Sequence, residues 1–191
     1  MRANVGSMRT LLGLLALVAV VAGAGRVPPA DTLVLLVRHA EKSSPSGDVP
    51  LSVVGEERAR ALVAVAREAG VVAAITTQFQ RTQQTAAPTL QALGLSAEVV
   101  AASNDIAEHA RQIGTMIRER YRGRTVLVVG HSNTVPAIIA ALGGPSLPDI
   151  CDSEYDRLFF LNVSDGSPTR LIQSRYGAPS PTDSACASMR R

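Results

Sequence analysis

The stretch Thr32-Leu33-Val34-Leu35-Leu36-Val37-Arg38-His39-Ala40-Glu41 decides the fold that we expect for this chain. Its first six residues form a short apolar run, which is typical of a buried strand in a parallel sheet. Ligands of open α/β sheets bind outside the carboxyl ends of the strands. The stretch therefore predicts a central strand that delivers Arg38 and His39 to the functional edge of a sheet.

A second apolar run, at residues 125–129, ends in the same way. It is followed by Gly130 and His131, and the glycine allows the backbone to approach a ligand closely. Arg81 comes a few residues after another predicted strand and near the start of a helix, where anions are favoured. Two imidazoles and two guanidiniums at one edge of a sheet indicate phosphoryl transfer through a histidine, because guanidinium matches two phosphoryl oxygens at once.

The rest of the chain alternates predicted strands with predicted helices, which favours a mostly parallel sheet covered on both faces. Strands are expected at 32–37, 71–77, 97–101, 125–129, 157–163 and 169–175, and helices at 52–69, 80–93, 104–122 and 134–142. Pro88 predicts a kink or a break in the second helix. Asp165-Gly166 predicts a turn between the last two strands. The expected fold class is a three-layer α/β/α sandwich with a mostly parallel central sheet and one late hairpin or antiparallel strand.

The length of 191 residues fits one α/β domain, which we place at residues 32–176. Residues 1–24 are typical of a secretory signal peptide, since Arg2 and Arg9 precede an apolar run that ends in small residues. The alternative is a membrane anchor that stays attached, although the run is short for a full span. Residues 25–31 are expected to form a linker, and the tail at 177–191 has the composition of a disordered segment.

Composition excludes several partners. The formal net charge is +3, and removal of Arg2 and Arg9 with the signal would leave the charge almost balanced, so nucleic acid is not expected as a partner. The three histidines and two cysteines do not lie at metal-ligand spacing, so no metal is expected. In an oxidising compartment Cys151 and Cys186 could form a disulfide; the alternative is two unpaired thiols.

Four separated blocks of the sequence together resemble one family. They are Arg38-His39-Ala40-Glu41-Lys42, Leu51-Ser52-Val53-Val54-Gly55, Arg81-Thr82-Gln83-Gln84-Thr85-Ala86 and Gly130-His131-Ser132-Asn133-Thr134. In residue type and order they resemble the histidine phosphatase superfamily, also called phosphoglycerate-mutase-like, over about residues 32–175. The resemblance implies that His39 attacks phosphorus and becomes phosphohistidine, while Arg38, Arg81 and His131 bind the phosphoryl group. It implies no cofactor.

The resemblance also implies a carboxylic acid that protonates the leaving group, but the sequence departs from the clearest family patterns. Ser132 stands where some members carry Asp directly after the second histidine. Other members use a Glu between the second arginine and the second histidine, which favours Glu108 or Asp105 here. Further candidates follow in the late loop, at Asp152, Glu154 and Asp156. Glu41 is expected to be a supporting residue, and His109 an ordinary residue of a helix surface.

The function expected from these observations is hydrolysis of phosphate monoesters by an exported enzyme, periplasmic or secreted and not membrane-bound after signal cleavage. The interval between Arg81 and His131 leaves little room for a lid, so the site should be open. The expected substrate is a phosphorylated small molecule, an envelope sugar or a phosphoprotein. Two alternatives stay open: a phosphoglycerate-mutase-type phosphotransferase, and a non-catalytic relative that binds phosphate or another anion.

Overall fold

The computed structural model describes Met1 and residues 31–181, and within them six strands form one sheet. The strands are β1 (Thr32–Arg38), β2 (Ala73–Thr76), β3 (Ala97–Val99), β4 (Thr125–Gly130), β5 (Arg157–Val163) and β6 (Arg170–Arg175). Their order across the sheet is β3-β2-β4-β1-β5-β6. β1 to β4 run parallel, β5 is antiparallel to β1, and β6 is antiparallel to β5. The sheet is therefore mostly parallel, with a late hairpin at one edge.

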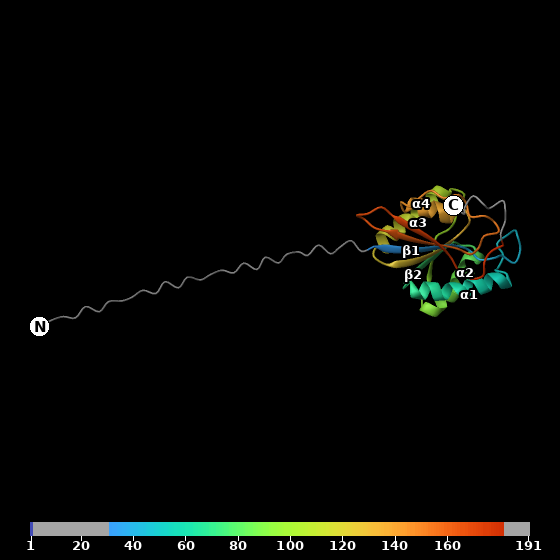
Figure 1. Ribbon diagram of the computed structural model, residues 1–191, viewed down its shortest axis with the longest axis horizontal. Coiled ribbons are helices and arrows are strands. Elements are labelled where there is room, and N and C mark those ends of the chain that lie inside the picture. The colour runs from blue at the N-terminus through green and yellow to red at the C-terminus, as the bar shows by residue number, and fades with distance from the viewer. Residues whose placement is uncertain (2–30, 182–191) are drawn as a thin grey trace.

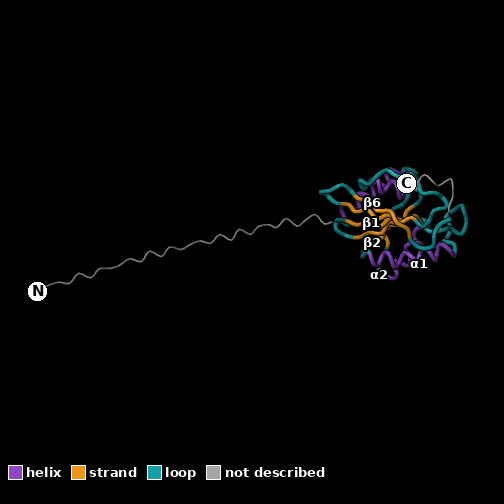
Figure 2. The backbone as a smooth tube through the Cα atoms, in the orientation of Figure 1, coloured by secondary structure: helices purple, strands orange, loops and turns teal. Residues whose placement is uncertain are grey.

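Helices cover both faces of this sheet (Figure 1). They are α1 (Val53–Glu68), α2 (Gln80–Leu93), α3 (Ile106–Arg120) and α4 (Thr134–Ala141). α1 and α2 lie on one face and α3 and α4 on the other, so the strands occupy a middle layer (Figure 2). Helix starts follow local rules: Ser52 caps α1 by accepting a hydrogen bond from the Gly55 amide, and Asp105 caps α3 in the same way. The expected three-layer α/β fold is confirmed.

β1 is the centre of the core because it is covered on both faces. Val34 and Leu36 point to the α3–α4 side, whereas Leu35 and Val37 point to the α1–α2 side, and all four side chains are fully buried. A strand with two buried faces needs an unbroken apolar run, which explains why this stretch does not alternate with polar residues. Polar residues of this strand stand only at its two ends, at Thr32 and Arg38.

The register of the parallel strands determines where the site forms. Arg38 pairs with Gly130, so β1 and β4 end side by side. The residues that follow them, His39 and His131, therefore leave the sheet at the same edge. The backbone amide of His39 donates to the Gly130 carbonyl at 2.9 Å, which extends the pairing one step beyond the strands.

α2 continues through Pro88, so of the predicted kink or break the break does not occur; the neighbouring Ala86 and Thr89 are fully buried and hold both sides of the proline in the packed layer. Residues 177–181 of the predicted tail are described, and Ala178 and Ser180 among them bond to the domain. The predicted signal peptide after Met1, most of the linker and Cys186 lie outside the described residues.

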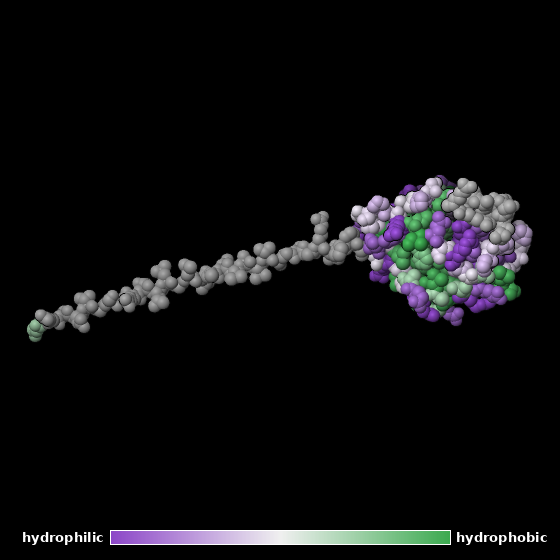
Figure 3. Space-filling view, in the orientation of Figure 1, coloured by the Kyte–Doolittle hydropathy of each residue, from purple (hydrophilic) through white to green (hydrophobic). Residues whose placement is uncertain are grey.

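The surface is mainly polar, with a strip of apolar residues crossing the face that Figure 3 shows. Within residues 31–181, no helix is both long enough and apolar enough to span a bilayer.

Candidate active site

A pocket of about 360 Å³ opens at the carboxyl ends of β1 and β4. Its walls come from five parts of the chain: the residues after β1, the start of α2, the loop before α3, the start of α4 and the loop before β5. The lining residues are Arg38, His39, Lys42, Phe79, Arg81, Ala102, Ser103, Asn104, Ile106, His131, Ser132, Asn133, Thr134 and Asp152. The structure thus brings Arg38, His39, Arg81 and His131 into one pocket.

His39 is held in one tautomer. Its Nδ1 lies 2.8 Å from the carbonyl oxygen of Ala40. A carbonyl oxygen can only accept, so Nδ1 carries the proton and Nε2 keeps a lone pair in the neutral ring. Burial, together with the nearby Arg38, His131 and Arg81, lowers the pKa of His39 to about 3. The hydrogen bond to Ala40 acts in the opposite direction and raises the pKa. The imidazole is therefore neutral and nucleophilic at physiological pH.

Arg38 is held by main-chain oxygens. Its Nη1 donates to the carbonyls of Cys151, Asp152 and Glu154 at 2.7, 3.1 and 3.2 Å. Tyr155 stacks on the guanidinium, with the ring centroid 4.2 Å from Cζ. Neutral carbonyls fix the guanidinium without cancelling its charge, which leaves that charge available to an anion.

The other edge of the Arg38 guanidinium is weakly engaged. Its Nε is buried and has no hydrogen-bond partner in the described part of the chain. Its Nη2 makes only long contacts, at 3.5 Å to the exposed carboxylate of Asp152 and 3.4 Å to the hydroxyl of Tyr155. A buried donor without a partner is uncommon. This Nε–Nη2 edge has the fork geometry that matches two oxygens of a phosphoryl group.

His131 lies opposite His39, with the ring centroids 5.5 Å apart. Its backbone amide donates to the Thr134 hydroxyl at 2.8 Å, and its Nε2 lies 3.1 Å from the Thr77 hydroxyl. Burial and the charge of Arg81 lower its pKa to about 4. Gly130 is required before it, since a Cβ there would lie 2.8 Å from the Thr134 hydroxyl oxygen.

Arg81 stands in the first turn of α2, where its Cζ lies 4.2 Å from the centroid of the Phe79 ring. Its Nη1 is 3.8 Å from the carboxylate of Asp48, and its buried Nε has no partner among residues 31–181. α2 is tied to the residues after β1, because the Thr85 hydroxyl donates to the Arg81 carbonyl and accepts from the Ala40 amide. Arg81 is thus held beside His39 by short hydrogen bonds.

The structure does not bring Glu108 to the pocket. Glu108 is exposed on α3 and accepts hydrogen bonds from Arg111 and Gln112, which lower the pKa of its carboxyl. Asp105 is occupied as the cap of α3. Glu108 is not among the residues that line the pocket, and its carboxylate bonds to two neighbours on its own helix.

The late-loop carboxylates divide into two groups. Glu154 and Asp156 are buried and bound to Arg157 and Arg175, away from the pocket lining. Asp152 lines the pocket and is fully exposed. Of the five carboxylates considered as proton donors, only Asp152 therefore lies where a leaving group could reach it.

His109 is not the surface residue that we expected. Only 1% of its area is exposed, and its Nδ1 lies 3.1 Å from the carbonyl of Ala101, because the loop before α3 folds over it. Residues 31–181 contain no group of three or more histidine, cysteine or acidic side chains that could hold a metal ion.

Sequence reasoning missed two aromatic side chains at the site: Phe79 lines the pocket, and Tyr155 stacks on Arg38 without being a lining residue. Phe79 packs edge-on against His131, and Tyr155 lies 6.0 Å from His39. Phe79 stands two residues before Arg81, so its place near the pocket could be predicted once Arg81 was assigned to the site. Tyr155 lies more than a hundred residues from Arg38, and no local signal links the two.

Two arginines and two imidazoles at the carboxyl edge of a parallel sheet form a site that can bind a phosphoryl group. The model of the histidine phosphatase superfamily (branch 1) matches residues 34–107, which include Arg38, His39 and Arg81. No curated protein was found to match the chain.

Solved structures share the fold at low sequence identity. The protein histidine phosphatase SixA complexed with tungstate is 18% identical, with a TM-score of 0.60, over 75% of this chain and 96% of that chain. A mycobacterial glucosyl-3-phosphoglycerate phosphatase is 16% identical, with a TM-score of 0.57, over 78% of this chain and 99% of that chain. A SixA structure from Agrobacterium tumefaciens is 21% identical, with a TM-score of 0.55, over 78% of this chain and 99% of that chain. At these identities the solved structures show a likeness of fold alone, and the family match covers residues 34–107.

Proposed function

We propose that this protein hydrolyses phosphate monoesters through a phosphohistidine intermediate on His39. The observation that carries the proposal is the hydrogen bond from His39 Nδ1 to the Ala40 carbonyl, in a pocket that also contains two arginines whose Nε atoms have no hydrogen-bond partner within residues 31–181. The bond aims a neutral Nε2 lone pair away from the main chain. The arginines supply the charge that a phosphoryl dianion needs.

In the first step, His39 Nε2 attacks phosphorus and a P–N bond forms as the P–O ester bond breaks. Arg38, Arg81 and His131 hold the equatorial oxygens, where negative charge accumulates. The leaving oxygen takes a proton, and we assign Asp152 as its donor because it is the carboxylate that lines the pocket. In the second step, water attacks phosphorus and passes a proton to the Asp152 carboxylate, the P–N bond breaks, and inorganic phosphate leaves with His39 and Asp152 restored.

The substrate follows from the shape of the pocket. The pocket is open and its lining is dominated by polar and cationic side chains, with Asp152 as the one carboxylate among the lining residues. Such a site binds the phosphoryl group tightly and the rest of the substrate loosely. We therefore propose a phosphorylated small molecule, such as an envelope sugar, or a phosphoprotein, met in the periplasm or outside the cell if residues 1–24 act as a signal.

The proposal is tested with p-nitrophenyl phosphate and a slower alkyl phosphate. Wild type should hydrolyse both, and rapid acid-free quenching followed by mass spectrometry should find a phosphate on the peptide that contains His39. Asp152→Asn should slow the alkyl ester more than the aryl ester, because only the poor leaving group needs the proton. Binding of inorganic phosphate without hydrolysis of either ester would instead support the non-catalytic anion-binding alternative, and phosphate transfer to an added sugar phosphate would support the mutase alternative.

A further inference from the structure

Residues 176–180 follow β6, and we call this segment the C-terminal strap. Its Pro- and Ser-containing sequence is typical of a loose tail, yet both ends of the strap are hydrogen-bonded to the domain. One end meets Arg58 of α1, and the other meets Tyr155 and Asp156.

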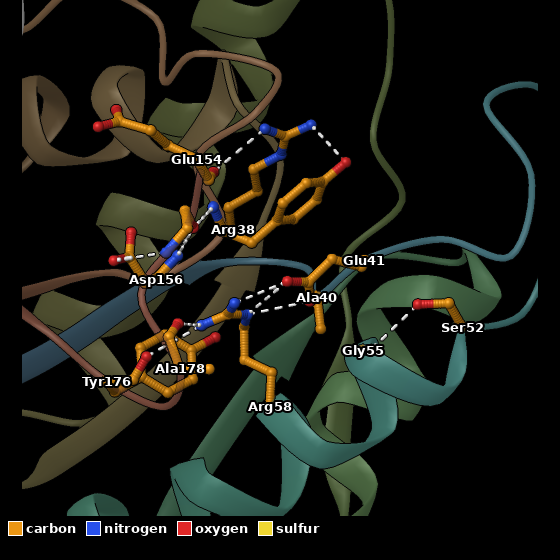
Figure 4. Close-up of polar contacts among 12 residues, drawn as sticks. Arg38, Ala40, Glu41, Ser52, Gly55, Arg58, Glu154, Asp156, Tyr176 and Ala178 are labelled. Atoms are coloured by element: carbon orange, nitrogen blue, oxygen red, sulfur yellow. Dashed lines mark hydrogen bonds and ion pairs between the residues drawn. The ribbon is translucent and has the colours of Figure 1, made fainter. Parts of the chain in front are cut away.

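The first attachment is the side chain of Arg58, which is 3% exposed. Its Nη1 donates to the carbonyls of Tyr176 and Ala178 at 3.0 and 2.8 Å. Its Nε and Nη2 donate to the carboxylate of Glu41 at 2.7 to 3.0 Å (Figure 4). Burial opposes the charge of Arg58, but the bonds with Glu41 raise its pKa, so the guanidinium stays ionised.

Glu41 connects this attachment to the nucleophile, because it lies two residues after His39. Its backbone carbonyl accepts the Ser52 amide at 2.9 Å, and a Cβ on Gly55 would lie 2.2 Å from the same oxygen. The turn that contains His39 therefore contacts the start of α1 through the Glu41 carbonyl. The same turn binds Arg58 through the Glu41 carboxylate.

The second attachment is Ser180. Its hydroxyl accepts the backbone amides of Tyr155 and Asp156 at 2.8 and 3.1 Å, and its own amide donates to the Asp156 carboxylate at 3.1 Å. Tyr155 in turn stacks on Arg38 and faces His39. The hydroxyl of Ser180 thus satisfies the two amides that fix the main chain beneath this ring.

We propose that the C-terminal strap is a positioning element of the active site, with Arg58 and Ser180 as its positioning residues. Arg58 acts on His39 through Glu41, and Ser180 acts on Arg38 through Tyr155. The inference rests on the proposed function in one respect: it assumes that the pocket binds phosphate. It concerns how the phosphate-binding groups are held in position. A displacement of about 1 Å at a reacting group can lower a rate about 100-fold.

The test compares four variants: Ser180→Ala, Ser180→Thr, Arg58→Met and Arg58→Lys. Val163→Ala is the matched control, because this buried residue lies at the opposite end of β5, paired with Thr32. Each variant is assayed well below its own melting temperature, so that only folded protein is measured. The readouts are the dissociation constant for inorganic phosphate by calorimetry, and kcat and KM for p-nitrophenyl phosphate.

Ser180→Ala and Arg58→Met should weaken phosphate binding and lower kcat/KM by about 10- to 100-fold, whereas Val163→Ala should lose melting temperature alone. Ser180→Thr, which keeps the hydroxyl, should recover most of the loss. If folded Ser180→Ala and Arg58→Met bind phosphate as wild type does, the strap has only a structural role and the inference is overturned. Failure of the proposed function looks different: wild type itself would bind phosphate without hydrolysing the ester, and the binding comparison would still decide the role of the strap.

Discussion

Two clusters of buried charge both involve residues 151–156, and they differ in how their charges are matched. In the first, Glu154 and Asp156 are bound directly to the guanidiniums of Arg157 and Arg175. In the second, the pocket, Arg38 is held by carbonyls and both pocket arginines keep an Nε without a partner in the described residues. In a buried cluster whose charges are matched, removal of one partner leaves the other charge uncompensated and destabilises the fold. A cluster whose arginine N–H donors have no partner among the described residues is arranged for a ligand that brings negative charge.

The largest effect should come from the nucleophile in the pocket. His39→Asn removes the lone pair that attacks phosphorus, so kcat for p-nitrophenyl phosphate should fall by about 1000-fold or more. The melting temperature should fall little, because within the described residues the neutral ring makes one hydrogen bond, to the Ala40 carbonyl, and asparagine can donate to the same oxygen. A variant that keeps a tenth of the wild-type activity would remove His39 from the mechanism.

Arg38→Lys tests whether one guanidinium must bind the carbonyls of residues 151–154 with one edge and the phosphate with the other edge. A lysine ammonium can contact the carbonyls of Cys151 and Asp152 or the phosphate, but it cannot present a rigid fork to both. We expect kcat/KM to fall by about 100-fold. Arg120→Lys, at an exposed ion pair with Glu98, is the control and should leave kcat/KM unchanged. Equal activity of Arg38→Lys and wild type would contradict the assigned role.

Asp156→Asn probes the matched cluster. The Asp156 carboxylate accepts two hydrogen bonds from Arg175, at 2.6 and 2.7 Å, and one from the Ser180 amide. Its loss should lower the free energy of unfolding by about 1.5–3 kcal/mol at pH 7, measured by urea denaturation. Burial alone would raise the pKa of Asp156, but these bonds lower it, so this contribution should fade as the pH falls through the lowered pKa. An unchanged urea midpoint would show that the cluster does not stabilise the fold.

The imidazoles of the pocket should also affect stability as the pH changes. In the unfolded chain a histidine titrates near about 6.5, whereas burial lowers the pKa of His39 to about 3 and that of His131 to about 4. Between these values the unfolded state binds more protons, so stability should fall with falling pH by up to about 1.4 kcal/mol per pH unit for each group. Imidazole ¹⁵N shifts in the folded protein should stay those of neutral rings from pH 8 to pH 5. A ring that titrates near pH 6.5 would contradict this.

The smallest effect is expected at Glu108, which sequence patterns favoured as the acid. Its carboxylate is exposed and bound to Arg111, so Glu108→Gln should change the stability by less than about 0.5 kcal/mol. It should leave kcat for an alkyl phosphate within twofold of wild type. A large loss with the alkyl ester alone would return Glu108 to the mechanism and remove Asp152 from it.

The sequence predicted the elements that depend on local patterns. The unbroken apolar run of β1 could be recognised because a strand buried on both faces has no polar positions, and the ends of β1 and β4 followed from the polar residues after them. The convergence of Arg38, His39, Arg81 and His131 then followed from the parallel arrangement of the strands.

The parts that could not be predicted depend on contacts between distant segments. The carbonyls that hold Arg38 lie 113 to 116 residues further along the chain, and Arg58 reaches Tyr176 across 118 residues. Main-chain carbonyls carry no residue signature, so a sequence pattern cannot reveal that they will bind an arginine. Carboxylates are equally ambiguous in sequence, because Glu154 and Asp152 look alike until the partners of each are known.

The position of β1 in the sheet also constrains how the chain folds. β1 is the first strand to be synthesised, but it pairs with β4 and β5, whose residues come about ninety or more positions later. Closing such long loops slows folding, and an unpaired apolar strand can associate with other chains while it waits. We therefore expect the apolar residues 32–37 of the nascent protein to stay unpaired until β4 and β5 have emerged, which makes them a segment for chaperone binding during biogenesis.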